Sequence, residues 1–320
     1  DFTRLHKEIE RREIRVLFFD EVQVIENWEK FINQLLREGY KVFITGSNAS
    51  MLSVELGTHL TGRHLSMELF PFSYSEFIRF KKLNNDENAV IDYLKTGGIP
   101  EYVKSDVSYV LNALVDDILM RDIAIRHSVR DVNSLRQLTA YLITNIGNLV
   151  SANKLSGMFD IKSPATFLEY FSFLKDAYLL DFIPMFSHSL KIQARNPKKV
   201  YVTDMGLYTE NALSTSDNMG RRLENLVFLH LRRKYKHIFY YKDRGECDFI
   251  AIEKNTVKEA IQVCLTITNE NFDREYNGLL EAIQNLGLKQ GTIVTLNQSD
   301  TFEKDGIIIR MMPAASLLYV

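Results

Sequence analysis

The chain has 320 residues, 46% of them hydrophobic and 25% charged, and a formal net charge of -2 at pH 7. This length allows two or three domains with real cores, and the charge argues against a globally basic nucleic-acid binder while allowing local basic patches. No apolar run approaches the ~20 residues that a membrane helix needs, and no signal peptide is recognisable. The two cysteines, Cys247 and Cys264, lack metal-ligand spacing. We therefore expect a multidomain protein of the reducing cytoplasm that does not enter membranes.

Two apolar runs near the N-terminus each stop at polar side chains. Residues 16–21 end in two carboxylates, and residues 42–47 end in small polar residues. Between these runs, residues 28–36 carry apolar side chains at helical spacing. The order strand, helix, strand predicts two parallel strands that are buried on both faces of a sheet. The carboxyl ends of both strands would then lie at the same edge of that sheet. Ligands of such sheets bind at that edge.

The residues at the two predicted strand ends suit nucleotide hydrolysis. In phosphoryl transfer, a carboxylate such as Asp20 helps to hold Mg²⁺, and a second one such as Glu21 can orient the attacking water. Thr45, Ser47 or Asn48 can then bond that water or the terminal phosphate. The alternative is that Asp20 only starts a turn and that Glu21 is solvated. The polar end of the second run favours the nucleotide site.

Four short segments, taken in order, resemble the motifs of one protein family. They are residues 16–23, 45–52, 60–63 and 69–77. Together they resemble the prokaryotic AAA-type ATPases, which are P-loop proteins with a C-terminal domain of unknown function. The resemblance implies that residues 1–78 form the C-terminal part of a P-loop NTPase core, with ATP and Mg²⁺ as cofactors of the full-length protein.

The same resemblance assigns roles to individual residues. It makes Asp20 and Glu21 the Walker B pair and places Ser47 or Asn48 at the sensor 1 position. It also makes Arg63 a candidate arginine finger, a role that suits a guanidinium because it stays charged and offers several donors to phosphate oxygens. An ordinary surface ion pair is the other interpretation of Arg63. A finger that acts on a second copy of the chain would imply self-association.

The family's phosphate-binding loop, G-x-x-x-x-G-K-[ST], does not occur in the 320 residues. Only fifteen residues precede Val16, and the first residue is Asp1 rather than methionine. We therefore expect the chain to be part of a longer protein that binds Mg-ATP through this loop together with Asp20. Without the loop's backbone amides and lysine, the 320 residues alone should bind ATP weakly.

Residues 79–130 are predicted to form a small helical domain. Apolar residues keep helical spacing over residues 107–118, and a Gly-Gly-Ile-Pro breaker precedes them. The breaker belongs to residues 97–101, which match the family's GGxPE motif. Tight backbone packing is the conservative explanation of its two glycines.

Residues 131–190 are predicted to form a winged-helix-like domain. Apolar spacing indicates three helices followed by a strand, which is the order of a DNA-reading module. The third helix begins after an N-cap Ser163 with Pro164 at its first position. It is rich in aromatic residues, and Lys175 is its only basic residue. This composition favours a structural role or a protein contact over the reading of DNA bases, although DNA remains a candidate partner.

Residues 191–320 hold a second candidate for chemistry. Glu224 lies on the apolar face of a predicted helix, and Asp248 and Gln262 lie on two of the strand-like runs that follow. This order is similar to the PD-(D/E)XK nuclease fold, which implies a restriction-endonuclease-like α/β domain. By that resemblance Glu224, Asp248 and Gln262 occupy metal-binding positions, and Cys264 stands where the fold has a lysine.

Two of these positions depart from the nuclease pattern. The neutral Gln262 can coordinate a metal through its carbonyl oxygen but supplies no charge, and the thiol of Cys264 cannot replace an ammonium. Two lysines can compensate from other positions: Lys242 and Lys258. We predict a nuclease-like fold with a degenerate site rather than an active nuclease. A scaffold that keeps its carboxylates for hydrogen bonds is the alternative.

Basic residues cluster before and within the first helix of this domain. They are Lys191, Arg195, Lys198, Lys199, Arg221, Arg222, Arg232, Arg233, Lys234 and Lys236. Such a cluster can follow a DNA backbone, but a solvated helix face is the commoner explanation. The overall prediction is an α/β multidomain protein of one of two classes. It is either an ATP-driven machine or a non-catalytic protein that binds DNA or proteins through degenerate sites.

Overall fold

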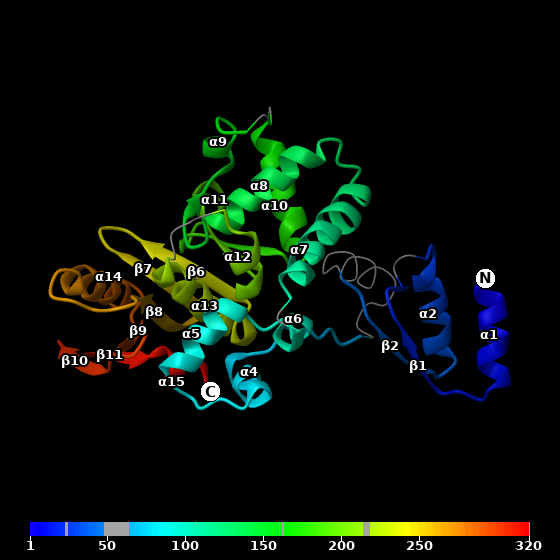
Figure 1. The fold of residues 1–320 in the computed structure, drawn as a ribbon, viewed down its shortest axis with the longest axis horizontal. Helices are drawn as coiled ribbons and strands as arrows, with labels where there is room; N and C mark the ends of the chain where they lie inside the picture. The colour runs from blue at the N-terminus through cyan, green and yellow to red at the C-terminus, as the bar shows by residue number, and fades with distance from the viewer. Residues whose placement is uncertain are drawn as a thin grey trace. The chain divides into compact units, whose positions relative to one another are not determined.

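The computed structural model describes residues 1–22, 25–47, 64–105, 107–159, 161, 163–213 and 218–319. The chain divides into two compact units (Figure 1). The first unit comprises Asp1–Leu69 with Asp176–Tyr178, and the second comprises Phe70–Lys175 with Leu179–Val320. Helices and several sheets alternate along the chain, as the α/β prediction requires. Across the described residues, no helix has both the length and the hydropathy to cross a bilayer.

The first unit contains the predicted strand, helix and strand. Its elements are α1 (Phe2–Arg11), β1 (Val16–Phe19), α2 (Trp28–Arg37) and β2 (Lys41–Ile44). The two strands are parallel, with Phe19 opposite Ile44. The apolar stripe of α2 packs into a core that Leu17 joins from β1. The strand–helix–strand prediction is therefore confirmed.

One face of this strand pair differs from the prediction. Phe18 is 76% exposed and Phe43 is 44% exposed, and their rings stack with centroids 4.8 Å apart. The expectation of burial on both faces is therefore wrong for the described residues. The reason is that the core around α2 takes side chains from the opposite face of the strands.

The second unit begins with a series of helices. They are α4 (Tyr74–Lys81), α5 (Glu87–Thr96), α6 (Pro100–Ser105), α7 (Ser108–Asp117) and the π-helix η2 (Ile118–Ile125). A capping box between Ser73 and Glu76 starts α4. Phe77 and Leu94 belong to the same core cluster as Val227 of the C-terminal region. The helices are thus packed into the body of this unit.

A second helical group carries a small antiparallel sheet. Its elements are α8 (Val132–Thr144), β3 (Leu149–Val150), α9 (Ala152–Leu155), α10 (Pro164–Asp176), β4 (Leu180–Ile183), α11 (Leu190–Arg195), β5 (Lys198–Val202) and α12 (Met205–Asn211). In the described chain the strands lie in the order β3-β5-β4. α10 buries Phe167, Tyr170, Phe171 and Leu174, so its aromatic residues serve packing, as their number predicts.

The C-terminal region is built on a larger sheet that has helices on both faces. The strands are β6 (His237–Lys242), β7 (Glu246–Glu253), β8 (Thr256–Val263), β9 (Gln290–Thr295), β10 (Asp300–Lys304) and β11 (Ile307–Pro313). The helices are α13 (Met219–Lys234), α14 (Phe272–Asn285) and α15 (Ala314–Leu318). Within the described residues the order is β10-β11-β9-β8-β7-β6, with β8, β9 and β11 parallel (Figure 1). Phe249 and Ile261 join the core of α13, whereas Ile250 and Ala260 join that of α14.

The Gly97-Gly98 pair packs against a buried carboxylate, Asp204. Gly97 has φ +72°, and a Cβ on it would lie 2.1 Å from Asp204 Oδ1. A Cβ on Gly98 would lie 2.2 Å from the carbonyl oxygen of Phe72. The carboxylate of Asp204 accepts hydrogen bonds from the amides of Gly98 (2.6 Å) and Gly206 (2.8 Å). Tight backbone packing is therefore confirmed as the reason for the glycines.

Asp204 should make the stability of the protein depend on pH. Burial raises the pKa of Asp204 to about 6, although the amides of Gly98 and Gly206 oppose this. Because this pKa exceeds that of an unfolded chain, the stabilisation is complete at low pH and is lost as the pH rises through about 6. Relative to Asp204→Asn, the wild-type protein should lose about 2 kcal/mol of unfolding free energy between about pH 4 and about pH 7. Denaturant titrations of both proteins measure this loss, and a difference that is flat with pH would contradict it.

Candidate functional site

The ends of β1 and β2 bring the predicted polar residues of the first unit together. The amide of Thr45 donates to the carbonyl of Phe19 at 2.9 Å, which continues the parallel pairing past the strands. The Thr45 hydroxyl donates to Asp20 Oδ1, and the Ser47 hydroxyl donates to Glu21 Oε2 at 3.3 Å. The two carboxylates and two hydroxyls thus meet at one edge of the strand pair.

The backbone also turns sharply at this edge. Glu21 has φ +49°, in the left-handed region that a glutamate rarely adopts. Asp20 and Thr45 are exposed, and Glu21 and Ser47 are half-buried, so a ligand can approach the edge. The other two predicted residues, Asn48 and Arg63, lie outside the described residues.

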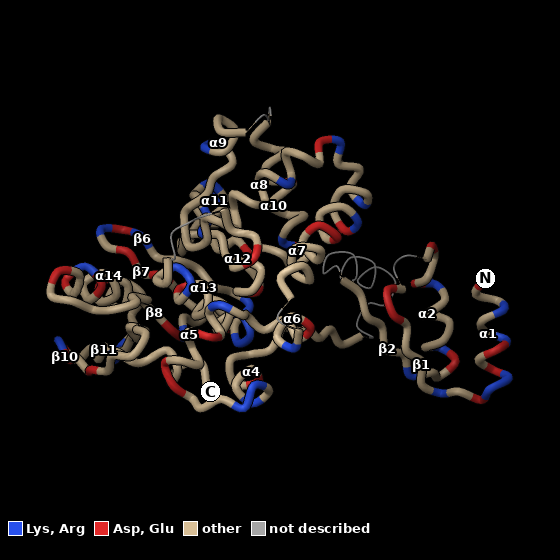
Figure 2. Tube along the Cα trace, in the orientation of Figure 1, with Lys and Arg blue, Asp and Glu red and all other residues tan. Residues whose placement is uncertain are grey.

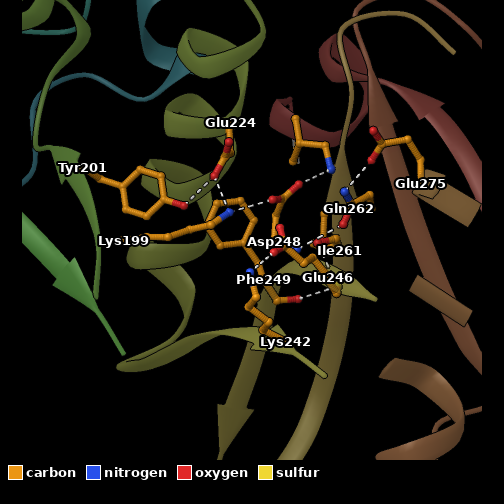
Figure 3. Close-up of polar contacts among 12 residues, drawn as sticks. Lys199, Tyr201, Glu224, Lys242, Glu246, Asp248, Phe249, Ile261, Gln262 and Glu275 are labelled. Atoms are coloured by element: carbon orange, nitrogen blue, oxygen red, sulfur yellow. Dashed lines mark hydrogen bonds and ion pairs between the residues drawn. The ribbon is translucent and has the colours of Figure 1, made fainter. Parts of the chain in front are cut away.

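A second polar cluster lies in the second unit, where β5, α13 and β7 meet. The Lys199 ammonium is 2.8 Å from Glu224 Oε1 and 2.7 Å from Asp248 Oδ1 (Figure 3). The Tyr201 hydroxyl donates to Glu224 Oε1 at 2.7 Å. Lys199 and Tyr201 are two positions apart on β5, so both point to the same side of the strand. The predicted residues Glu224 and Asp248 therefore meet, but they meet around a lysine.

A buried asparagine fixes how α13 faces β5. The Asn225 side chain accepts from the amide of Val202 at 2.9 Å and donates to the carbonyl of Val202 at 3.0 Å. This pair of bonds fixes the helix against the strand, which places Glu224 opposite Lys199. Gly147 leaves room for the glutamate, because a Cβ there would lie 3.1 Å from Glu224 Oε2.

Gln262, on β8, contacts the cluster through the backbone amide of Asp248 on the neighbouring strand β7. The amide of Asp248 donates to Gln262 Oε1 at 3.1 Å, and Gln262 Nε2 donates to Glu275 Oε2 at 2.5 Å. Arg274 forms an ion pair with Glu275. The carbonyl oxygen of Gln262, which was expected to coordinate a metal, thus accepts a hydrogen bond from the protein.

The charges around Lys199 keep its side chain protonated. Burial alone would lower the pKa of Lys199, but the charges of Asp248 and Glu224 outweigh burial and hold that pKa well above its usual range. Burial raises the pKa of Tyr201 well above its usual value, so the phenol remains a hydrogen-bond donor. Lys199 and Tyr201 therefore both donate hydrogen bonds to Glu224, whose own pKa is raised by burial and lowered by the nearby charge of Lys199, with burial the larger cause.

The arrangement does not fit a divalent metal ion as it stands. The space between the carboxylates of Glu224 and Asp248 contains an ammonium group. Among the residues that the structure describes, no group of three or more His, Cys, Asp or Glu side chains is placed to hold a metal. Of the lysines expected to compensate, Lys242 pairs with Glu246 instead, and Lys258 is exposed.

Lys199 was not predicted as a site residue, because its position in a basic run suggested contacts with phosphate. Other members of the basic cluster also have partners inside the protein. Arg232 pairs with Asp181 at 3.0 Å, and Lys234 pairs with Glu259 at 2.6 Å. Figure 2 shows acidic residues interspersed with basic ones along the chain. The strand pattern Lys-x-Tyr ahead of the Glu224 helix was the one signal that could have identified Lys199.

Comparisons with known proteins give two domain matches and two relatives. Residues 1–78 match the family described as an AAA domain, and residues 87–218 match a domain of unknown function, DUF8612. An uncharacterized protein from Methanocaldococcus jannaschii is 36% identical over 316 residues, which cover 90% of this chain and 70% of the relative. An uncharacterized protein from Haemophilus influenzae is 30% identical over 290 residues, which cover 86% of this chain and 72% of that relative. No solved structure matches.

Proposed function

This chain belongs to the same protein family as its relatives from Methanocaldococcus jannaschii and Haemophilus influenzae, and from that premise we propose that the natural protein is an AAA-type ATPase. One observation carries the proposal. Asp20 and Glu21 meet the hydroxyls of Thr45 and Ser47 at the carboxyl ends of parallel strands, inside the stretch that matches an AAA domain. Such an edge is where α/β folds bind nucleotides.

Each residue of this edge has a separate task. Bound magnesium would neutralise charge on the phosphates, and Asp20 is the exposed carboxylate suited to hold it. Glu21 orients the attacking water and accepts its proton. Ser47 positions Glu21 through their hydrogen bond, and by the family resemblance Ser47 or Asn48 takes the sensor 1 role. By the same resemblance, Arg63 would act as an arginine finger that contributes a positive charge to the terminal phosphate.

Calorimetric titration with ATP tests the binding step in the full-length protein. With magnesium present, the wild-type protein should bind ATP with a single saturable isotherm. Asp20→Asn should weaken this binding by about tenfold or more, because an amide loses the charge that holds the metal. Glu26→Gln, at an exposed position of the same unit, is the matched control and should leave the affinity unchanged. The absence of saturable binding by the wild-type protein would contradict the proposal.

The rest of the chain is proposed to contain two further folds after the small helical domain of residues 79–130. The order α8, α9, α10, β4 supports a winged-helix-like domain in residues 131–190, and β4 pairs with β5, which follows that range. The strands β6 to β9 with α13 and α14 support a PD-(D/E)XK-like domain in residues 191–320. ATP turnover would reposition these domains. The alternative, a non-catalytic protein that binds DNA or other proteins, requires that the natural protein hydrolyse no ATP.

A further inference from the structure

We propose that Lys199 is the resident cation of the Glu224–Asp248 carboxylate pair, and that it closes this pair to divalent metal ions. The ammonium lies within 2.8 Å of one carboxylate and 2.7 Å of the other. The exposed fractions of the three side chains are 12%, 14% and 13%, respectively. Two carboxylates removed from water to this degree require a cation, and Lys199 supplies it.

Two further hydrogen bonds reach the pair from the surrounding protein. Asp248 Oδ2 accepts from the amide of Val263 at 2.9 Å, and Glu224 Oε1 accepts from Tyr201 as well as from Lys199. A metal such as Mn²⁺ takes oxygen ligands from several groups at once. Here it would have to displace the ammonium or lie within a few ångströms of it. Either arrangement is unfavourable, because like charges repel strongly in a partly desolvated site.

The resident cation also joins two parts of the second unit. Lys199 belongs to the small sheet of β3, β5 and β4, whereas Glu224 and Asp248 belong to α13 and to the larger sheet. Asn225 connects the same helix to the same strand. The ion cluster therefore holds β5 against α13 and β7, at a position where the nuclease-like pattern would place a metal. This role does not depend on ATP hydrolysis at Asp20.

Titration with Mn²⁺, followed by the loss of the free-ion electron paramagnetic resonance signal, tests the proposal. The wild-type protein should show no Mn²⁺ site that depends on Asp248. Lys199→Met should gain one Mn²⁺ site, at least about tenfold tighter than any site of the wild-type protein, because the carboxylates lose their internal cation. Adding Asp248→Asn to Lys199→Met should abolish that site. Lys198→Met, which removes the neighbouring lysine of β5, is the matched control and should gain no site.

Stability provides a second readout. Mn²⁺ should raise the thermal midpoint of Lys199→Met more than that of the wild-type protein, since only the variant has an open site at the Glu224–Asp248 pair. If Lys199→Met does not fold without metal, Lys199→Gln replaces it, because its amide can still donate hydrogen bonds. Binding of Mn²⁺ by the wild-type protein that is lost in Asp248→Asn would overturn the proposal. Failure of the Lys199 variants to gain Mn²⁺ binding would overturn it too.

Discussion

Glu21→Gln should reduce ATP hydrolysis by the natural protein about 100-fold or more while ATP binding persists. The substitution keeps the size of the side chain and its bond with the Ser47 hydroxyl, but it removes the carboxylate that orients and deprotonates water. General-base catalysis of this kind contributes about 100-fold to 10,000-fold. Steady-state release of phosphate, measured beside calorimetric ATP affinity, separates the loss of turnover from a loss of binding.

Glu26→Gln is again the control, because it removes a carboxylate from the same unit at an exposed position outside the strand edge. Its turnover should equal that of the wild-type protein. Equal turnover in Glu21→Gln and the wild-type protein would show that water is activated elsewhere, and the role given to Glu21 would then be lost.

Gly97→Ala should destabilise the protein by at least about 3 kcal/mol. Two effects add: an alanine is strained at φ +72°, and its Cβ would lie 2.1 Å from Asp204 Oδ1. The carboxylate cannot retreat without losing its bonds to the amides of Gly98 and Gly206. The free energy of unfolding in denaturant measures the loss.

Gly287→Ala is a comparison without the contact, because Gly287 also has a positive φ, +68°, and, among the described residues, no atom lies within 4 Å of the place that a Cβ would take. This variant should therefore lose about 1 kcal/mol, from backbone strain alone. A loss in Gly97→Ala no larger than that in Gly287→Ala would mean that neither the contact with Asp204 nor the conformation of Gly97 adds a penalty, and the explanation of the glycine pair would fail.

The strands and helix of the first unit could be predicted because each is specified by the spacing of apolar residues within its own segment. The apolar runs and the stripe of α2 specify strand, helix and strand, and the polar residues that end the runs specify the edge where Asp20 meets Thr45. The exposed face of Phe18 could not be predicted, because an apolar run does not say which neighbours cover it. The pairing of β8 with β9 across α14 is likewise set by long-range topology rather than periodicity.

The composition of the ion cluster could be predicted only in part. Glu224 was located because a carboxylate on an apolar helix face needs a partner, and the structure gives it Lys199 and Tyr201. Lys199 lies 25 residues before Glu224 and 49 residues before Asp248 in the sequence. No local pattern specifies contacts over such separations, so the identity of the partner could not be predicted. Charge runs alone are therefore poor guides to function where a strand directs one of their members inward.

The most direct test of the central claim, nucleotide hydrolysis at the β1–β2 edge, is a crystal structure of the natural protein with magnesium and a non-hydrolysable ATP analogue. The terminal phosphate should lie at the ends of β1 and β2, with Asp20 on the metal side and Glu21 and Ser47 facing the position of the attacking water. A nucleotide bound away from Asp20 and Glu21 would contradict the account.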